Sequence, residues 1–106
     1  MAADRLAFLE KLTAQSPQKA LAWYGLAMEH RSRGTRGESL AAFEKCIAVD
    51  TSYVPAYFQC AMMLDECGER DAARARLTEG IRVAERVGDA HAAGEMRSQL
   101  ELWDNF

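Results

Sequence analysis

Apolar residues recur three or four positions apart in successive segments of the chain. The first clear segment has Leu21, Trp23, Tyr24, Ala27 and Met28. Later segments have Leu40, Phe43 and Ile47, and then Ala73, Leu77, Ile81 and Ala84. This spacing places the apolar side chains on one face of an α-helix, and no strand-like alternation of apolar and polar residues interrupts it. The pattern predicts an all-α protein of about six helices in antiparallel neighbouring pairs.

Glycines and capping residues mark where these helices begin and end. Gly34 follows the first apolar segment, and glycine just past a helix favours the left-handed closing conformation. Ser16–Pro17 has the order of an N-cap followed by proline at the first helical position. Gly88 breaks the chain again, and Asp89 is suited to cap a last helix over roughly 89–104.

Much of the sequence repeats with an offset of 34 residues. Residues 22–53 align with residues 56–87 without a gap, and eight of the 32 aligned positions are identical. The offset continues upstream, where LAFLEK matches LAAFEK, and downstream, where Met62 matches Met96. A fixed period of this length indicates stacked two-helix units, because one such unit cannot cover its own apolar face.

The repeat also predicts how the chain is organised. A length of 106 residues corresponds to one domain. Within it we expect an N-terminal half-repeat helix (1–16), two whole repeats (20–53 and 54–87) and a C-terminal capping helix (88–106).

Charge and composition narrow the classes of partner. The formal net charge is −3, with acidic and basic residues interleaved, so nothing favours nucleic acid or an anionic membrane. No apolar run approaches the length of a membrane span, and the start of the sequence does not read as a secretory signal. Three cysteines without a framework spacing suit a reducing compartment. We therefore expect a cytoplasmic protein.

The 34-residue unit resembles the tetratricopeptide repeat (TPR) family over nearly the whole chain. The first unit matches the family pattern at Trp23, Leu26, Ala27, Gly34, Phe43 and Val49, and the second at Tyr57, Ala61, Gly68, Ala73, Leu77 and Val83. It departs from that pattern at Ser39, Cys46, Thr51 and Glu85. The resemblance implies a right-handed α-solenoid of antiparallel helix pairs that acts as a non-enzymatic module for binding proteins.

In this family the first helices of successive units line a concave groove that binds peptides. Carried over by position, the groove of this chain would be lined by Tyr24, Met28, Arg31, Phe58, Met62, Asp65, Met96 and Gln99. Methionine recurs in this set at the 34-residue step and suits varied apolar partners, so an amphipathic or hydrophobic segment is the expected ligand. The carboxylate-binding version of the groove is not expected, because lysines and asparagines are missing at the matching positions. Two alternatives stay open: the same side chains could be covered internally, or they could mediate homodimer formation.

No residue pattern predicts catalysis, a cofactor or a metal site. Nucleophile elbows and phosphate-binding glycine loops are lacking, so we expect no enzyme. His30 and His91 are expected to pack, the latter because it aligns with Tyr57. Cys46 and Cys60 fall at core positions. Cys67, beside a turn, is the thiol that we expect to be exposed.

The last helix is expected to dock on the second repeat through Met96, Leu100 and Trp103. Leu102 and Phe106 lie off that stripe. They are either frayed surface residues or part of a contact between chains, and the sequence leaves both interpretations open.

Overall fold

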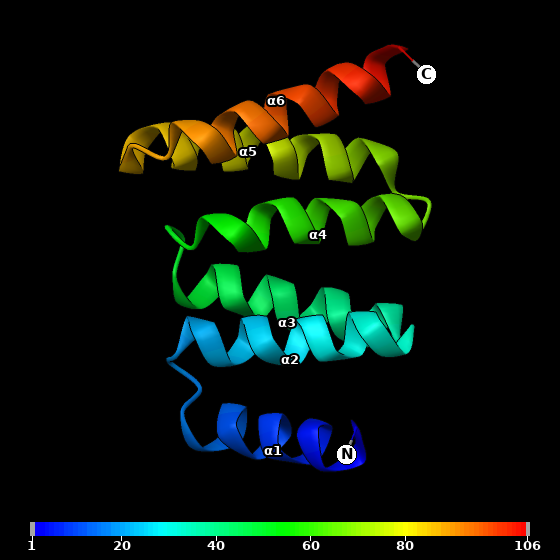
Figure 1. Cartoon of the computed structure of the whole chain (residues 1–106), viewed down its shortest axis with the longest axis vertical. Helices are drawn as coiled ribbons and strands as arrows, with labels where there is room; N and C mark the ends of the chain where they lie inside the picture. Colours follow the sequence, from blue (N-terminus) through cyan, green and yellow to red (C-terminus); the bar gives the residue numbers. More distant parts are fainter. Residues whose placement is uncertain (1, 106) are drawn as a thin grey trace. The chain divides into compact units, whose positions relative to one another are not determined.

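The computed structural model describes the backbone of residues 2–105 and the side chains of residues 4–105. Within that range the chain forms six α-helices (Figure 1). They are α1 (Ala2–Gln15), α2 (Ala20–Arg33), α3 (Arg36–Val49), α4 (Val54–Glu66), α5 (Arg70–Val87) and α6 (Ala90–Asn105). The helices fall into two compact units, Met1–Tyr53 and Val54–Phe106.

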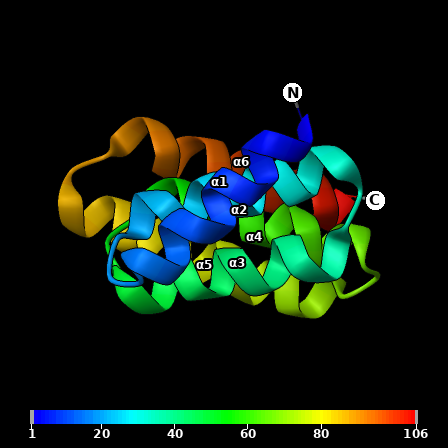
Figure 2. The same ribbon diagram turned by 90° about the horizontal axis from the view of Figure 1, so that it is seen from below.

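In the first unit α2 is the central helix and contacts both α1 and α3. Figure 2 shows α1 lying over α2, and Figure 1 shows α2 and α3 running in opposite directions. The α2–α3 pair is tied by the buried hydroxyl of Ser39, which donates a hydrogen bond of 2.8 Å to the carbonyl of Ala27. Tyr24 packs edge-on against Phe43, with ring centroids 5.9 Å apart.

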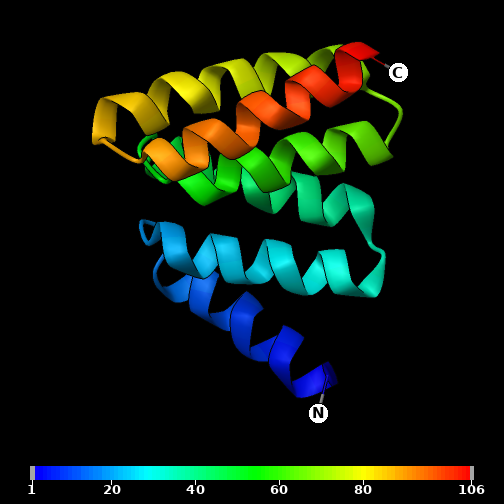
Figure 3. The same ribbon diagram turned by 45° about the horizontal axis from the view of Figure 1, so that its top comes forward.

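In the second unit α5 contacts both α4 and α6, and Figure 3 shows α6 alongside α5. The predicted stripe on α6 docks as expected, because Met96 and Trp103 are buried and Leu100 is half-buried. The guanidinium of Arg70 lies 4.8 Å from the centroid of the Trp103 ring. Leu102 is exposed on the other side of this helix, and Phe106 lies outside the described residues.

Glycine closes three of the helices, as the sequence predicted for Gly34. Gly34, Gly68 and Gly88 have φ angles of 78°, 82° and 81°, in the left-handed region that glycine adopts without steric cost. At the first of these turns the Gly34 amide donates to the carbonyl of Arg31, and the Thr35 amide donates to that of His30. Asp89 caps the last helix by accepting a hydrogen bond of 3.0 Å from the amide of Ala92, which confirms that expectation.

The predicted start of α2 is wrong. Ser16 and Pro17 belong to the turn before α2, which begins only at Ala20. The Lys19 amide donates to the Ser16 carbonyl, and the indole N–H of Trp23 donates to the Pro17 carbonyl at 2.8 Å. These bonds stabilise the turn, and α2 begins three residues after Pro17. The Trp23–Pro17 bond spans six residues and is not part of the capping pattern.

Most apolar residues of the repeat pattern are buried, but Trp23 and Val49 are only half-buried. The largest buried side chains, at under 2% exposure, are Tyr57, Phe43, Met63, Leu77 and Met96, and Met63 is not part of the predicted pattern. Cys46 and Cys60 are buried and Cys67 is exposed, as predicted. Within the described part of the chain, none of the helices combines the length and the apolar character needed to cross a membrane.

Candidate functional site

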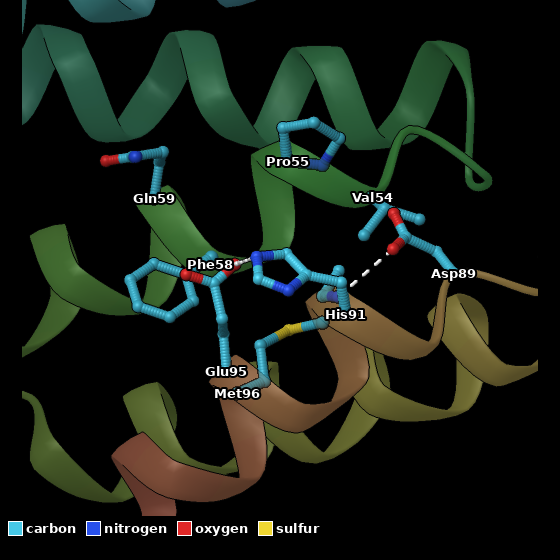
Figure 4. A pocket seen from close by; sticks show the side chains of 9 residues that line it. Val54, Pro55, Phe58, Gln59, Asp89, His91, Glu95 and Met96 are labelled. Carbon is cyan, nitrogen blue, oxygen red and sulfur yellow. Dashed lines mark hydrogen bonds and ion pairs between the residues drawn. The ribbon is translucent and has the colours of Figure 1, made fainter.

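A pocket of about 320 Å³ lies between α4 and α6 in the second unit. It is lined by Val54, Pro55, Phe58, Gln59, Asp89, His91, Ala92, Glu95 and Met96. Figure 4 shows these side chains, with those of α4 facing those of α6 and of the turn that precedes it. Because both helices belong to the same compact unit, the pocket is defined within that unit.

The apolar part of the pocket comes from both helices. Val54 is buried at the start of α4, and Phe58, one turn further on, is half-buried. Met96 is 1% exposed, because its sulfur packs against α5 at Gly80. Apolar side chains at these depths make a hydrophobic floor with a partly exposed aromatic ring.

The charged part of the pocket is acidic and comes from α6 and the turn that precedes it. Glu95 Oε1 lies 3.4 Å from His91 Nε2, one helical turn away, and the two side chains are 59% and 87% exposed. Asp89 contributes a second carboxylate, one oxygen of which caps α6 through the Ala92 amide. None of the nine lining residues is lysine or arginine, so Asp89 and Glu95 give the lining a negative formal charge.

Of the predicted groove residues on α4 and α6, the pocket includes two, Phe58 and Met96. Met62 and Gln99 are half-buried and do not line it. The carboxylate of Asp65 forms an ion pair with Arg70 at the start of α5, so part of its binding capacity is used within the unit.

The predicted groove residues of the first unit share one face of α2. Tyr24, Met28 and Arg31 are spaced by four and three residues and are all half-buried. Tyr24 packs against Phe43 and also against Tyr53, with ring centroids 5.3 Å apart in the second pair. Burial raises the pKa of the Tyr24 hydroxyl above its ordinary value, with the neighbouring Cys46 thiol acting in the same direction. This set is therefore partly occupied by aromatic packing within its own unit.

The two histidines differ from each other. His30 is half-buried, and its Nδ1 lies 2.8 Å from the hydroxyl of Thr35, which agrees with the predicted packing role. The expectation for His91 is wrong, because its side chain is 87% exposed. The aligned Tyr57 is buried against Gly80 of α5, the helix that follows it. No helix follows α6 within the described residues, so His91 is not covered in this way.

Sequence reasoning missed the polar residues of the pocket, namely Asp89, His91 and Glu95, and also Gln59. A usable signal was present, since His91 and Glu95 stand four residues apart and therefore share a face of α6. Among the described residues, no group of three or more His, Cys, Asp or Glu is placed to hold a metal ion. The arrangement is thus one of apolar contact and carboxylate charge.

The fold and this pocket define a small all-α protein of paired helices with the TPR architecture. The solution structure of a tetratricopeptide repeat domain protein from Salinibacter ruber is similar to this chain with a TM-score of 0.74 and 26% identity, over 78% of this chain and 84% of that one. A crystal structure of a tetratricopeptide repeat domain protein from the same organism gives 0.72 and 26%, over 76% and 90%. A crystal structure of MamA gives 0.71 and 20%, over 99% and 72%.

These likenesses confirm the TPR resemblance and the predicted fold class, an all-α array of antiparallel helix pairs. The likeness to MamA concerns the fold alone. The sequence matches no protein-family model, and no curated protein matches it. TPR-like folds serve in general as protein–protein interaction modules and not as enzymes, and this chain has such a fold.

Proposed function

We propose that the chain is a non-enzymatic interaction module whose α4–α6 pocket binds a peptide segment of a partner protein. The observation that carries the proposal is the position of the pocket. It lies between α4, which starts the predicted second repeat, and α6, the predicted capping helix, and it combines a half-buried Phe58 with a buried apolar floor. Concave sites of this composition bind ligands by covering apolar groups while a few polar side chains fix their orientation.

The size of the pocket limits what enters it. Ligand pockets typically measure about 300 to 1,000 Å³, and this one is near the lower limit at about 320 Å³. One or two side chains of a segment fill such a space, and the rest of the segment lies along the helices. We propose that the remainder follows the face of the second unit that carries Met62 and Gln99. The α2 face of Tyr24, Met28 and Arg31 is proposed as a separate peptide-binding surface of the first unit.

Substitution of the floor tests the pocket. Peptides selected from a randomised display library against the full chain are titrated, by fluorescence anisotropy, into the parent protein and into Phe58→Ala. We expect the affinity to fall about tenfold or more, because a truncated anchor aromatic costs about 2 kcal/mol at a binding site. Leu102→Ala is the matched control, since Leu102 is an exposed apolar residue of α6 that does not line the pocket. Equal losses in the two variants contradict the proposal.

The two faces outside the pocket have their own test. Met28→Glu places a charge on the half-buried α2 face of the first unit, and Met62→Glu places one on the half-buried α4 face of the second. If far-ultraviolet circular dichroism shows both variants folded and the selected peptides bind as before, binding is confined to the pocket.

Self-association is a second candidate function, favoured by a different surface. On α1, Phe8 is 62% exposed, and together with Lys11, Leu12 and Gln15 it lines a shallow hollow of about 230 Å³. An exposed aromatic beside a half-buried leucine is a plausible contact between two copies. Light scattering across a concentration series tests this function, and Phe8→Glu is expected to abolish any dimer. A parent chain that stays monomeric at high concentration excludes it.

A further inference from the structure

The charge on the pocket selects among peptide ligands. We infer that the α4–α6 pocket takes a segment with a lysine or arginine next to a large apolar side chain, an inference that rests on the proposed function. The apolar residue would occupy the floor at Phe58 and Met96. The cation would be held by Glu95, with Asp89 adding to the negative field.

The position of Glu95 supports this assignment. Its carboxylate is 59% exposed and belongs to the same pocket as the half-buried Phe58 ring, so a long cationic side chain reaches it while the neighbouring residue is in contact with the ring. His91 Nε2 lies 3.4 Å from Glu95 Oε1, and the carboxylate keeps further lone pairs with which to accept from an incoming ammonium or guanidinium group.

Asp89 strengthens the preference without being required for it. One oxygen of Asp89 accepts a hydrogen bond from the Ala92 amide. The second oxygen of the carboxylate can accept a hydrogen bond from a ligand. The absence of lysine and arginine from the lining means that an anionic ligand, such as a chain-terminal carboxylate, would meet two carboxylates and no fixed cation. The charge thus favours basic segments and disfavours acidic ones.

The test uses the peptides selected against the full chain, together with versions in which each lysine or arginine is replaced by glutamine. We expect the selected sequences to be enriched in a basic residue adjacent to leucine, phenylalanine or methionine. Glu95→Gln should weaken these peptides about two- to fivefold, the usual range for a solvent-exposed ion pair. The glutamine versions should bind Glu95→Gln and the parent equally well.

Two further variants distinguish an effect of the pocket charge from a general loss of folding. Glu101→Gln removes an exposed carboxylate from α6 that does not line the pocket, and it should leave all affinities unchanged. His91→Lys places a fixed cation in the pocket at an 87% exposed position, and it should weaken the basic peptides at least as much as Glu95→Gln.

Each remaining outcome has a definite meaning. Selected peptides that depend on Phe58 but are acidic or uncharged overturn the inference and leave the proposed function in place. Peptides whose binding is indifferent to Phe58→Ala overturn both. A synthetic peptide of residues 2–16, which carries Phe8, Lys11 and Leu12, is included as the probe for a second copy. If it outcompetes every selected peptide and the chain dimerises, the occupant is α1 of another copy and not a partner protein.

Discussion

Glu29 on α2 and Met63 on α4 occupy the same position of successive 34-residue units, and both are buried. The Glu29 carboxylate is accompanied by two arginines. Its oxygens lie 3.1 Å from Arg5 Nε and 2.9 Å from Arg33 Nε, and its side chain is only 8% exposed. Thirty-four residues further on, the positions of these arginines hold Ser39, which is still in the first unit, and Cys67 in the second, and the buried residue is methionine.

A second pair of positions shows the same interdependence. Cys46 on α3 corresponds to Gly80 on α5, and Trp23 on α2 corresponds to Tyr57 on α4. A Cβ on Gly80 would lie 2.6 Å from the Cβ of Tyr57, so the glycine permits the close approach that buries this tyrosine. Where the cysteine stands instead, Trp23 stays half-buried, under Lys45 at 5.9 Å from the ring centroid.

The two units therefore share a backbone plan and differ in how neighbouring side chains compensate one another. A buried position accepts a carboxylate in one unit only because its cationic partners accompany it. A bulky ring is buried in the other only because glycine faces it. Single-residue exchanges between the units test this dependence directly, because they move a residue without its partners.

The largest effect is expected from Met63→Glu. This variant buries a carboxylate in the second unit without the two arginines that the first unit provides, and we expect the free energy of unfolding to fall by about 3 kcal/mol or more. The reverse exchange, Glu29→Met, should cost much less, because its partners Arg5 and Arg33, with side chains 71% and 28% exposed, reach water when the carboxylate is gone. Urea unfolding followed by circular dichroism measures both, and equal losses would refute the partner argument.

The next effect concerns the close approach at Gly80. Gly80→Ala places a Cβ 2.6 Å from Tyr57 Cβ and 2.7 Å from the Met96 sulfur, so a neighbouring helix has to shift. Overpacking of this kind costs about 1 to 3 kcal/mol, and it outweighs the gain in helix propensity of just under 1 kcal/mol.

Gly94→Ala is the control for that exchange. Gly94 lies inside α6 with nothing within 4 Å of an added Cβ, so alanine should stabilise the chain by about 0.5 to 1 kcal/mol. Opposite signs in thermal or urea unfolding support the packing argument, and two stabilising substitutions contradict it.

These pairs also show how far the sequence reaches. The 34-residue offset was enough to predict helices, glycine turns and the buried cysteines, because each depends on spacing within one repeat. The start of α2 was mispredicted, since it depends on a bond from the Trp23 indole to the Pro17 carbonyl across six residues. Alignment also could not distinguish Trp23 from Tyr57, because the burial of Tyr57 depends on its close approach to Gly80 on another helix.

The candidate site was predictable only in part. The repeat placed Phe58 and Met96 among the groove residues, and both line the pocket. His91 was assigned to the interior by its alignment with Tyr57, but burial of that tyrosine requires the helix that follows it. The last described helix has no such neighbour, so His91 stays exposed where its alignment with Tyr57 predicts packing.

A smaller effect distinguishes the two units at alkaline pH. Burial, with help from Asp50, raises the pKa of the Cys46 thiol from 9.0 to about 11, whereas Gly80 at the matching position cannot titrate. Below pH 9 both the folded and the unfolded chain keep the thiol proton. Between pH 9 and 11 the unfolded chain releases it first, so the free energy of unfolding falls as pH rises.

At pH 10 this contribution amounts to about 1 kcal/mol. Cys46→Ala should therefore lose less stability between pH 8 and pH 10 than the parent does, whatever its stability at pH 8. Urea unfolding of both proteins at the two pH values measures the stability that each loses, and the two losses are then compared. Identical losses in the two proteins would mean that the thiol does not carry the alkaline sensitivity of the first unit.

The smallest effect is expected at Ser39, whose counterpart is Ala73. The Ser39 hydroxyl is fully buried and donates a hydrogen bond of 2.8 Å to the Ala27 carbonyl. Ser39→Ala removes about 1 kcal/mol of hydrogen bonding and regains a few tenths through helix propensity, so a net loss of about 0.5 kcal/mol is expected in urea unfolding. Ser98→Ala, at an exposed serine of α6, is the control and should not lose stability.

The reverse exchange asks whether the second helix pair offers the same acceptor. Ala73 and Ala61 are both fully buried and stand where Ser39 and Ala27 stand in the first unit. If α4 and α5 pack with the spacing of α2 and α3, the hydroxyl of Ala73→Ser reaches the Ala61 carbonyl, and the change in stability stays within about 0.5 kcal/mol. A loss above about 1 kcal/mol would mean a buried hydroxyl without an acceptor, and the two pairs would then differ in backbone spacing as well as in side chains.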